Sequence, residues 1–189
     1  MLSFGEACAL ARRRGTRLLA VDGLPCSGKS TLAGEIVETA GFQCIAVDDF
    51  FLPLSAWPHD IRPSFPSAFY RYGEFLAAVK ELAESGRCSY FPFDWGSMNV
   101  SQESRLVRLA DGPVLVEGTS SLHPDIAPLF DLRFFVESDE TTILEAVLER
   151  DGNYFEKEWR NLWLPSLALY METKPRERTD FFVAGRGVR

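Results

Sequence analysis

Short continuous apolar runs alternate with amphipathic segments along most of the chain. The apolar runs predict β-strands at 17–21, 44–47, 113–116, 132–136 and 180–184. Apolar positions spaced three or four residues apart predict helices at 3–13, 30–40, 73–85, 141–150 and 159–171. Strands without polar alternation are typical of a parallel sheet that helices cover on both faces. The pattern therefore predicts one α/β domain spanning residues 1–189.

A glycine-containing segment, GLPCSGKST at 23–31, connects the first predicted strand to a predicted helix. Gly23 and Gly28 permit backbone angles that a Cβ atom would forbid, so backbone N–H groups can turn toward phosphate oxygens at the positive end of the helix. The segment matches the Walker A motif GxxxxGK[ST], in which Lys29 reaches the β- and γ-phosphates and Ser30 binds Mg²⁺. We therefore expect ATP and Mg²⁺ as cofactors. The expected ATP-binding residues are Gly23, Cys26, Ser27, Gly28, Lys29, Ser30 and Thr31.

Acidic residues follow two of the other predicted strands. Asp48 and Asp49 come after the second strand, and Glu117 ends the third. The carboxyl ends of parallel strands form the ligand-binding edge of such a sheet, so Asp48 and Glu117 are expected beside Lys29. Phosphoryl transfer to a hydroxyl needs a carboxylate near the attacking oxygen and oxygen ligands around Mg²⁺. Asp48 suits the first role and Glu117 the second, directly or through a water molecule.

Each of these carboxylates has an alternative interpretation. Asp49 is the rival of Asp48, because adjacent residues of a strand point to opposite faces. Asp48 and Glu117 can also be ordinary turn or cap residues at the ends of strands.

Two further segments have the composition of substrate-contacting regions. Residues 52–72 are rich in proline and aromatic residues, which predicts either a substrate-facing loop or an irregular surface excursion. Residues 150–161 are predicted to form a lid, in which an arginine would stabilise charge on the transferring phosphate and exclude water. Arg150 is the first candidate and Arg160 the second. Alternatively, Arg150 is a cation that stabilises the C-terminus of its helix.

Composition restricts the classes of partner. The net charge of −7 disfavours binding to long nucleic acids, and no apolar run approaches the 18 residues expected of a membrane span. The 4 cysteines form no C-x-x-C pair and no zinc-binding spacing, which favours reduced thiols and a cytoplasmic protein. A small-molecule hydroxyl acceptor is the expected partner. The sequence does not distinguish a monomer from a homo-oligomer.

The order of the motifs resembles the uridine kinase-like branch of the P-loop kinases, which includes nicotinamide riboside kinases. The Walker A motif is followed by VDDFF at 47–51, PFDW at 92–95, VEGTSSL at 116–122, ERD at 149–151 and TDFFV at 179–183. This resemblance extends from about residue 17 to 184. It implies a three-layer P-loop fold, with a parallel sheet flanked by helices and a short lid.

The resemblance also implies roles for individual residues. Asp48 matches the catalytic carboxylate, Glu117 the acidic residue near Mg²⁺, and Arg150 a lid arginine. Phe51 matches an aromatic residue of the acceptor pocket, and Asp94 lies in a segment that flanks the acceptor. We also assign Arg160 to the acceptor side as the second lid arginine.

Two departures concern the lid. Residues 146–149 read AVLE where uridine kinases carry extra arginines, and NYFEKEW at 153–159 replaces a glycine- and arginine-rich segment. These differences weigh against uridine itself more than against phosphoryl transfer.

The expected function is ATP-dependent transfer of the γ-phosphate to a hydroxyl of a small molecule. Aromatic residues in 50–72 and 91–95 favour a planar acceptor such as a nucleoside, unless they belong to the core. A non-nucleoside alcohol, such as a vitamin precursor or a sugar, is the alternative acceptor. A nucleotide-binding regulatory protein that phosphorylates no acceptor is the alternative from another class.

Overall fold

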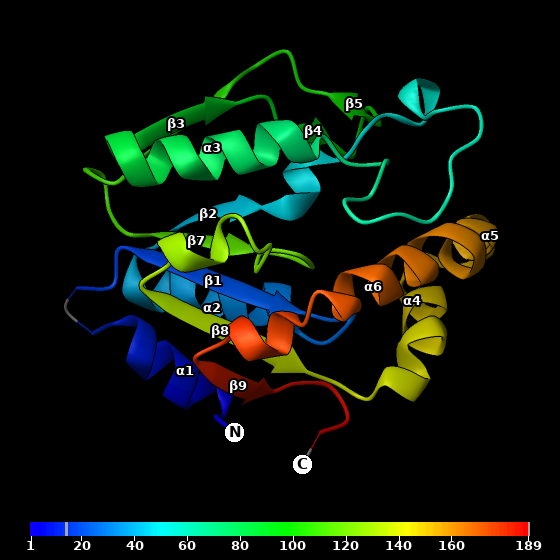
Figure 1. The fold of residues 1–189 in the computed structure, drawn as a ribbon. Coiled ribbons are helices and arrows are strands. Elements are labelled where there is room, and N and C mark those ends of the chain that lie inside the picture. The colour runs from blue at the N-terminus through cyan, green and yellow to red at the C-terminus, as the bar shows by residue number, and fades with distance from the viewer. Residues whose placement is uncertain (14, 189) are drawn as a thin grey trace.

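A central parallel sheet organises the molecule. The computed structural model describes residues 1–13 and 15–188, and its five-stranded sheet has the order β2-β7-β1-β8-β9 (Figure 1). All neighbouring pairs in this sheet run parallel. The strands are β1 (Leu18–Gly23), β2 (Gln43–Ala46), β7 (Val114–Glu117), β8 (Leu132–Glu137) and β9 (Phe181–Ala184). The predicted α/β fold with a parallel sheet flanked by helices is confirmed.

Helices cover both faces of the sheet. Alternate residues of β1 separate the core: Leu19 and Val21 pack with α1 (Phe4–Ala11) and α2 (Lys29–Ala40), whereas Leu18 and Ala20 pack with α3 (Tyr72–Ser85). Because both faces of the central strands are buried, their apolar runs are continuous. Figure 1 shows α3 and α1 on opposite sides of the strands.

The remaining helices lie near the carboxyl ends of the strands. Figure 1 shows α4 (Ile143–Asp151), α5 (Glu156–Glu158) and α6 (Leu164–Glu172) on this side. A π-helical segment, Trp159–Trp163, joins α5 to α6 without a break, so the helix predicted at 159–171 begins three residues earlier than expected. In the part of the chain that the structure describes, no helix is both long and apolar enough to cross a membrane.

Two small antiparallel sheets were not predicted. One pairs β3 (Arg87–Tyr90) with β6 (Arg105–Arg108), and the other pairs β4 (Phe93–Asp94) with β5 (Asn99–Val100). In β3, Cys88 and Tyr90 are buried, whereas Arg87 and Ser89 are exposed. Four residues are too few for this alternation to stand out in the sequence.

The second strand of the main sheet ends earlier than predicted. β2 stops at Ala46, and Val47–Phe50 forms a 3₁₀ turn. Asp48 and Asp49 therefore belong to a turn. The expectation that strand geometry points their side chains in opposite directions does not apply here.

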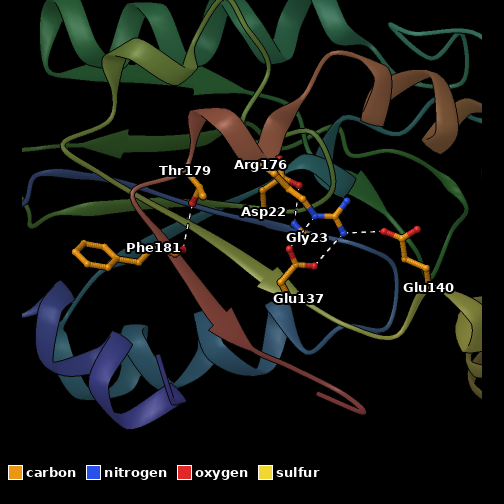
Figure 2. Close-up of polar contacts among 7 residues, drawn as sticks. All are labelled: Asp22, Gly23, Glu137, Glu140, Arg176, Thr179 and Phe181. Carbon is orange, nitrogen blue, oxygen red and sulfur yellow. Dashed lines mark hydrogen bonds and ion pairs between the residues drawn. The ribbon is translucent and has the colours of Figure 1, made fainter. Parts of the chain in front are cut away.

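Arg176 forms ion pairs with two acidic residues near the β8–β9 edge of the sheet. Figure 2 shows Arg176, from the 3₁₀ turn Pro175–Arg178, donating to both carboxylate oxygens of Glu137 at 2.8 and 2.9 Å and to Glu140 at 2.7 Å. The guanidinium also lies 5.1 Å from the ring centroid of Phe135. These contacts join the end of β8 to the turn that precedes α4.

Removing these contacts of Arg176 should lower the stability of the fold and leave ligand affinity unchanged. The Arg176 side chain is 34% exposed, so solvent screening limits its contribution. We expect Arg176→Ala to lower the free energy of unfolding by about 1 kcal/mol. The melting temperature should fall by about 2–4 °C in a thermal unfolding experiment. An unchanged melting temperature would mean that these contacts contribute nothing.

Candidate functional site

A cavity of about 810 Å³ lies where the carboxyl ends of the strands meet residues 150–170. Its walls come from the phosphate loop (residues 23–31), the segment after β2, the end of β7, the aromatic segment 52–72 and the helices near residues 150–170. This volume falls within the range of small-molecule and cofactor sites. Most, but not all, of the site residues predicted from the sequence line this cavity.

The phosphate loop has the backbone geometry that its glycines allow. Gly23 has φ +151°, and a Cβ atom there would lie 2.5 Å from the carbonyl oxygen of Val136. Gly28 has φ +103° and precedes α2, whose N-terminus has no side-chain cap. The first N–H groups of α2 therefore need an external acceptor, for which an anionic phosphate is suited.

The residues of the loop divide into two groups. Gly23 and Ser27 are buried and do not line the cavity. The Ser27 hydroxyl has no hydrogen-bond partner in the described chain. The cavity is lined by Cys26, Gly28, Lys29, Ser30 and Thr31. The second group is therefore placed to touch a ligand.

Lys29 is held inside the loop. Lys29 is only 8% exposed, and its Nζ donates to the carbonyl oxygen of Leu24 at 2.8 Å. Burial lowers its pKa, whereas the carboxylates of Glu117, Asp22 and Asp48 favour the charged form. A phosphate would supply further negative charge to this desolvated ammonium group.

The side-chain oxygen atoms of Ser30 and Glu117 lie close together at the cavity. The Ser30 hydroxyl lies 3.4 and 3.5 Å from the two carboxylate oxygens of Glu117. Burial raises the pKa of Glu117, and Lys29 opposes this shift. A hydroxyl and a desolvated carboxylate are hard oxygen donors, the type that Mg²⁺ prefers.

The described residues contain no cluster of three or more His, Cys, Asp or Glu that could hold a metal ion alone. This agrees with the usual binding of Mg²⁺, which takes one or two protein ligands and completes its shell with water and substrate phosphates. The residues present therefore fit the expected ion.

Asp48 and Asp49 have different surroundings. Asp48 lines the cavity, and the Tyr70 hydroxyl donates to its Oδ1 at 2.5 Å. Asp49 does not line the cavity; its Oδ2 accepts from the Tyr90 hydroxyl and from Arg105 Nη1, both at 2.8 Å. The side chains therefore diverge as expected, although the 3₁₀ turn rather than a strand separates them.

Aromatic rings form the wall of the cavity near Asp48. Phe51 lies with its ring centroid 5.3 Å from those of Tyr70 and Trp95 and 6.3 Å from that of Trp163, and all four residues line the cavity. The segment 52–72 contributes further lining residues, which include Phe65. This segment thus faces the cavity, as one of its two interpretations predicted.

Arg150 reaches the cavity from the end of α4. Its guanidinium donates to the two oxygens of Asp151 at 2.5 and 2.8 Å, and these hydrogen bonds raise its pKa. Asp151 also accepts from Trp159 Nε1 at 3.2 Å, so the pair is attached to the helix that follows. Both Arg150 and Asp151 line the cavity.

Two solved structures share the fold along nearly the whole chain. A protein named as a possible uridine kinase from Bacillus stearothermophilus matches with a TM-score of 0.71 and 20% identity, over 95% of this chain and 96% of its own. A protein named as a candidate fructose transport system kinase from Silicibacter sp. TM1040 has a TM-score of 0.67 and 18% identity, over 97% and 99%. The chain therefore shares its α/β fold with these two proteins. No protein-family model and no curated protein sequence matches it.

Besides Gly23 and Ser27, two predicted acceptor-binding residues, Asp94 and Arg160, lie outside the cavity lining. Asp94 accepts from the backbone N–H of Gly96 at 2.9 Å and from the Ser97 hydroxyl at 2.7 Å, within a local turn. Arg160 donates to Glu156 at 2.7 Å on the surface of the lid helix. The structure places neither side chain in the cavity lining.

Sequence reasoning missed a buried carboxylate at the end of β1. Asp22 is fully buried and accepts from the N–H groups of Gly23, Ser120 and Leu122 at 2.6, 3.2 and 2.8 Å. The Tyr170 hydroxyl also donates to it at 2.5 Å, and burial raises its pKa. Asp22 therefore connects the phosphate loop to α6. In the sequence, the sign of this buried residue is an acidic side chain that directly follows the apolar run 18–21.

Proposed function

We propose that the protein is an ATP-dependent phosphotransferase that moves the γ-phosphate of ATP to a hydroxyl of a small molecule. The observation that supports this most is that one cavity contains a phosphate loop with Lys29 and, across the end of β7, the carboxylate of Asp48. A nucleotide site without transfer has no need of a carboxylate beside a cavity wall of aromatic rings. The fold shared with proteins named as kinases agrees with this proposal.

In the proposed mechanism, Asp48 orients the acceptor hydroxyl and takes its proton as the oxygen attacks the γ-phosphorus. The bond between the γ-phosphorus and the bridging oxygen breaks, and ADP leaves with that oxygen. Tyr70 holds Oδ1 of Asp48, which leaves the second carboxylate oxygen for the acceptor. Lys29 and Arg150 stabilise negative charge on the transferring group. Mg²⁺, held by Ser30 and Glu117, would neutralise charge on the β- and γ-phosphates.

The aromatic wall supports an acceptor with a planar ring, such as a nucleoside. Phe51, Trp95 and Trp163 offer ring faces and edges to the part of the cavity near Asp48. Rings of this kind bind planar groups by stacking. A sugar or an aliphatic vitamin precursor is the alternative, because hydroxyl groups of Ser67, Tyr70 and other residues also line the cavity.

An ADP-release assay tests the function. ATP and Mg²⁺ are supplied with a panel of nucleosides, sugars and vitamin-precursor alcohols, and ADP is followed enzymatically. We expect release that depends on one acceptor class and saturates with its concentration. Tight ATP binding with no acceptor-dependent ADP release from the entire panel would instead favour a regulatory protein.

Arg150 gives a sharper test of the lid. Arg150→Ala should lower kcat by roughly 10- to 100-fold and change the acceptor KM much less, because its contact strengthens in the transition state. Arg160→Ala is the matched control, since Arg160 is also paired with an acid but lies outside the cavity lining. Its kcat should stay near the parent value. A lower melting temperature with unchanged kcat in Arg150→Ala would make Arg150 a helix-end cation.

A further inference from the structure

The chain after β9 folds back over the phosphate loop. The backbone N–H of Arg186 donates to the carbonyl oxygen of Ser27 at 3.0 Å, and that of Gly185 donates to Glu137 at 2.9 Å. A Cβ atom at Gly185 would lie 2.2 Å from the carbonyl oxygen of Ser27, so the two backbones meet too closely for any side chain. Gly185 and Arg186 therefore attach the segment 185–188, called the tail, to the loop.

The tail brings a cation to the cavity that the sequence did not single out. Arg186 lines the same cavity as Gly28, Lys29 and Arg150. Among the described residues, its guanidinium has one ion-pair contact, from Nη2 to Glu149 at 2.7 Å. The two side chains are 54% and 72% exposed, and an exposed pair of this kind contributes little to stability. The guanidinium can therefore exchange Glu149 for a ligand at small cost.

The strand order fixes which end of a nucleotide lies near this arginine. Across the sheet edge, Asp48 follows β2, Glu117 ends β7, the phosphate loop follows β1, and Arg186 follows β9 beyond β8. The γ-phosphate must lie between Lys29 and Asp48 if it is transferred to a hydroxyl there. The nucleoside end of ATP must then extend away from Asp48, toward the ends of β8 and β9.

We propose that Arg186 binds the nucleoside half of ATP, with its planar guanidinium against the base. Arginine stacks on aromatic faces and, unlike lysine, presents a flat delocalised cation to them. The contact makes the tail one wall of the nucleotide site and Arg186 a determinant of nucleotide affinity. This inference rests on the proposed function for the direction of the nucleotide.

Isothermal calorimetry without an acceptor tests the inference. Arg186→Ala should weaken MgATP binding by roughly tenfold, on the scale of a partly desolvated cation–π contact. Binding of Mg-tripolyphosphate, which lacks the nucleoside, should change by less than about twofold if the contact is to the base rather than to phosphate. An equal loss for both ligands, or no loss for ATP, would overturn the assignment.

Two variants control for indirect effects. Arg133→Ala removes an arginine that pairs with Asp180 at the amino end of β9, outside the cavity lining, and should leave ATP affinity unchanged. Glu149→Gln frees Arg186 from its present partner and should preserve or tighten ATP binding. A Glu149→Gln loss as large as that of Arg186→Ala would make the ion pair itself structural and would contradict the proposal. Because no acceptor is present, this result stands apart from the ADP-release assay of the proposed function.

Discussion

Lys29→Ala should abolish acceptor-dependent ADP release and weaken ATP binding. The ammonium group is desolvated within the phosphate loop, with Leu24 as its backbone acceptor, and the substitution removes the point charge expected on the β- and γ-phosphates. The kinetic loss should exceed 10²-fold, the scale on which electrostatic stabilisation of a transition state acts. Steady-state kinetics and calorimetry with ATP measure the two effects separately.

Lys174→Ala is a matched control for this experiment. Lys174 pairs with Glu177 at 2.9 Å on the surface, and it does not line the cavity. Its removal should leave both kcat and ATP affinity near the parent values. Parent-like turnover in Lys29→Ala, with Lys174→Ala also unaffected, would refute the assignment of the phosphate loop.

Asp48→Asn should reduce kcat by roughly 10²-fold or more, the usual scale of positioned acid–base catalysis. The amide keeps the size of the side chain and a hydrogen bond with Tyr70, but it lacks the basic carboxylate. ATP affinity should change little, because the phosphate loop and Lys29 hold the triphosphate. The measurement is steady-state kinetics with calorimetry of ATP binding.

Asp49→Asn is the neighbouring control. Asp49 accepts from Tyr90 and Arg105, so the substitution weakens a network that joins the turn after β2 to the β3–β6 sheet. We expect a lower melting temperature and a much smaller kinetic loss than for Asp48→Asn. A larger loss of kcat at Asp49 than at Asp48 would reverse the two roles.

Local sequence patterns account for the expected site residues that line the cavity, such as Lys29, Asp48 and Glu117. The phosphate loop is a strand, two glycines and a helix within one short segment, so neighbouring residues determine it. Asp48 and Glu117 follow from a general property of parallel sheets, because their strands end at one edge. Neither argument requires knowledge of distant contacts.

The parts that were missed depend on distant contacts or on competing local hydrogen bonds. Asp49 pairs with Arg105, 56 residues later in the chain. The antiparallel β3–β6 sheet, which was not predicted from the sequence, positions this arginine. Arg186 reaches the cavity only because Gly185 packs against the backbone of the phosphate loop. Asp94 was expected at the acceptor, but the adjacent turn binds its carboxylate, and Trp95 lines the cavity instead.

Transfer of labelled phosphate tests the central claim most directly. ATP labelled with radioactive phosphorus in the γ position is incubated with the enzyme, Mg²⁺ and the acceptor class found in the ADP-release assay, and the products are separated chromatographically. We predict that the label appears in a phosphorylated acceptor, in an amount equal to the ADP formed, and that Asp48→Asn reduces both together. Label found in inorganic phosphate alone would show that water is the acceptor and would contradict the account.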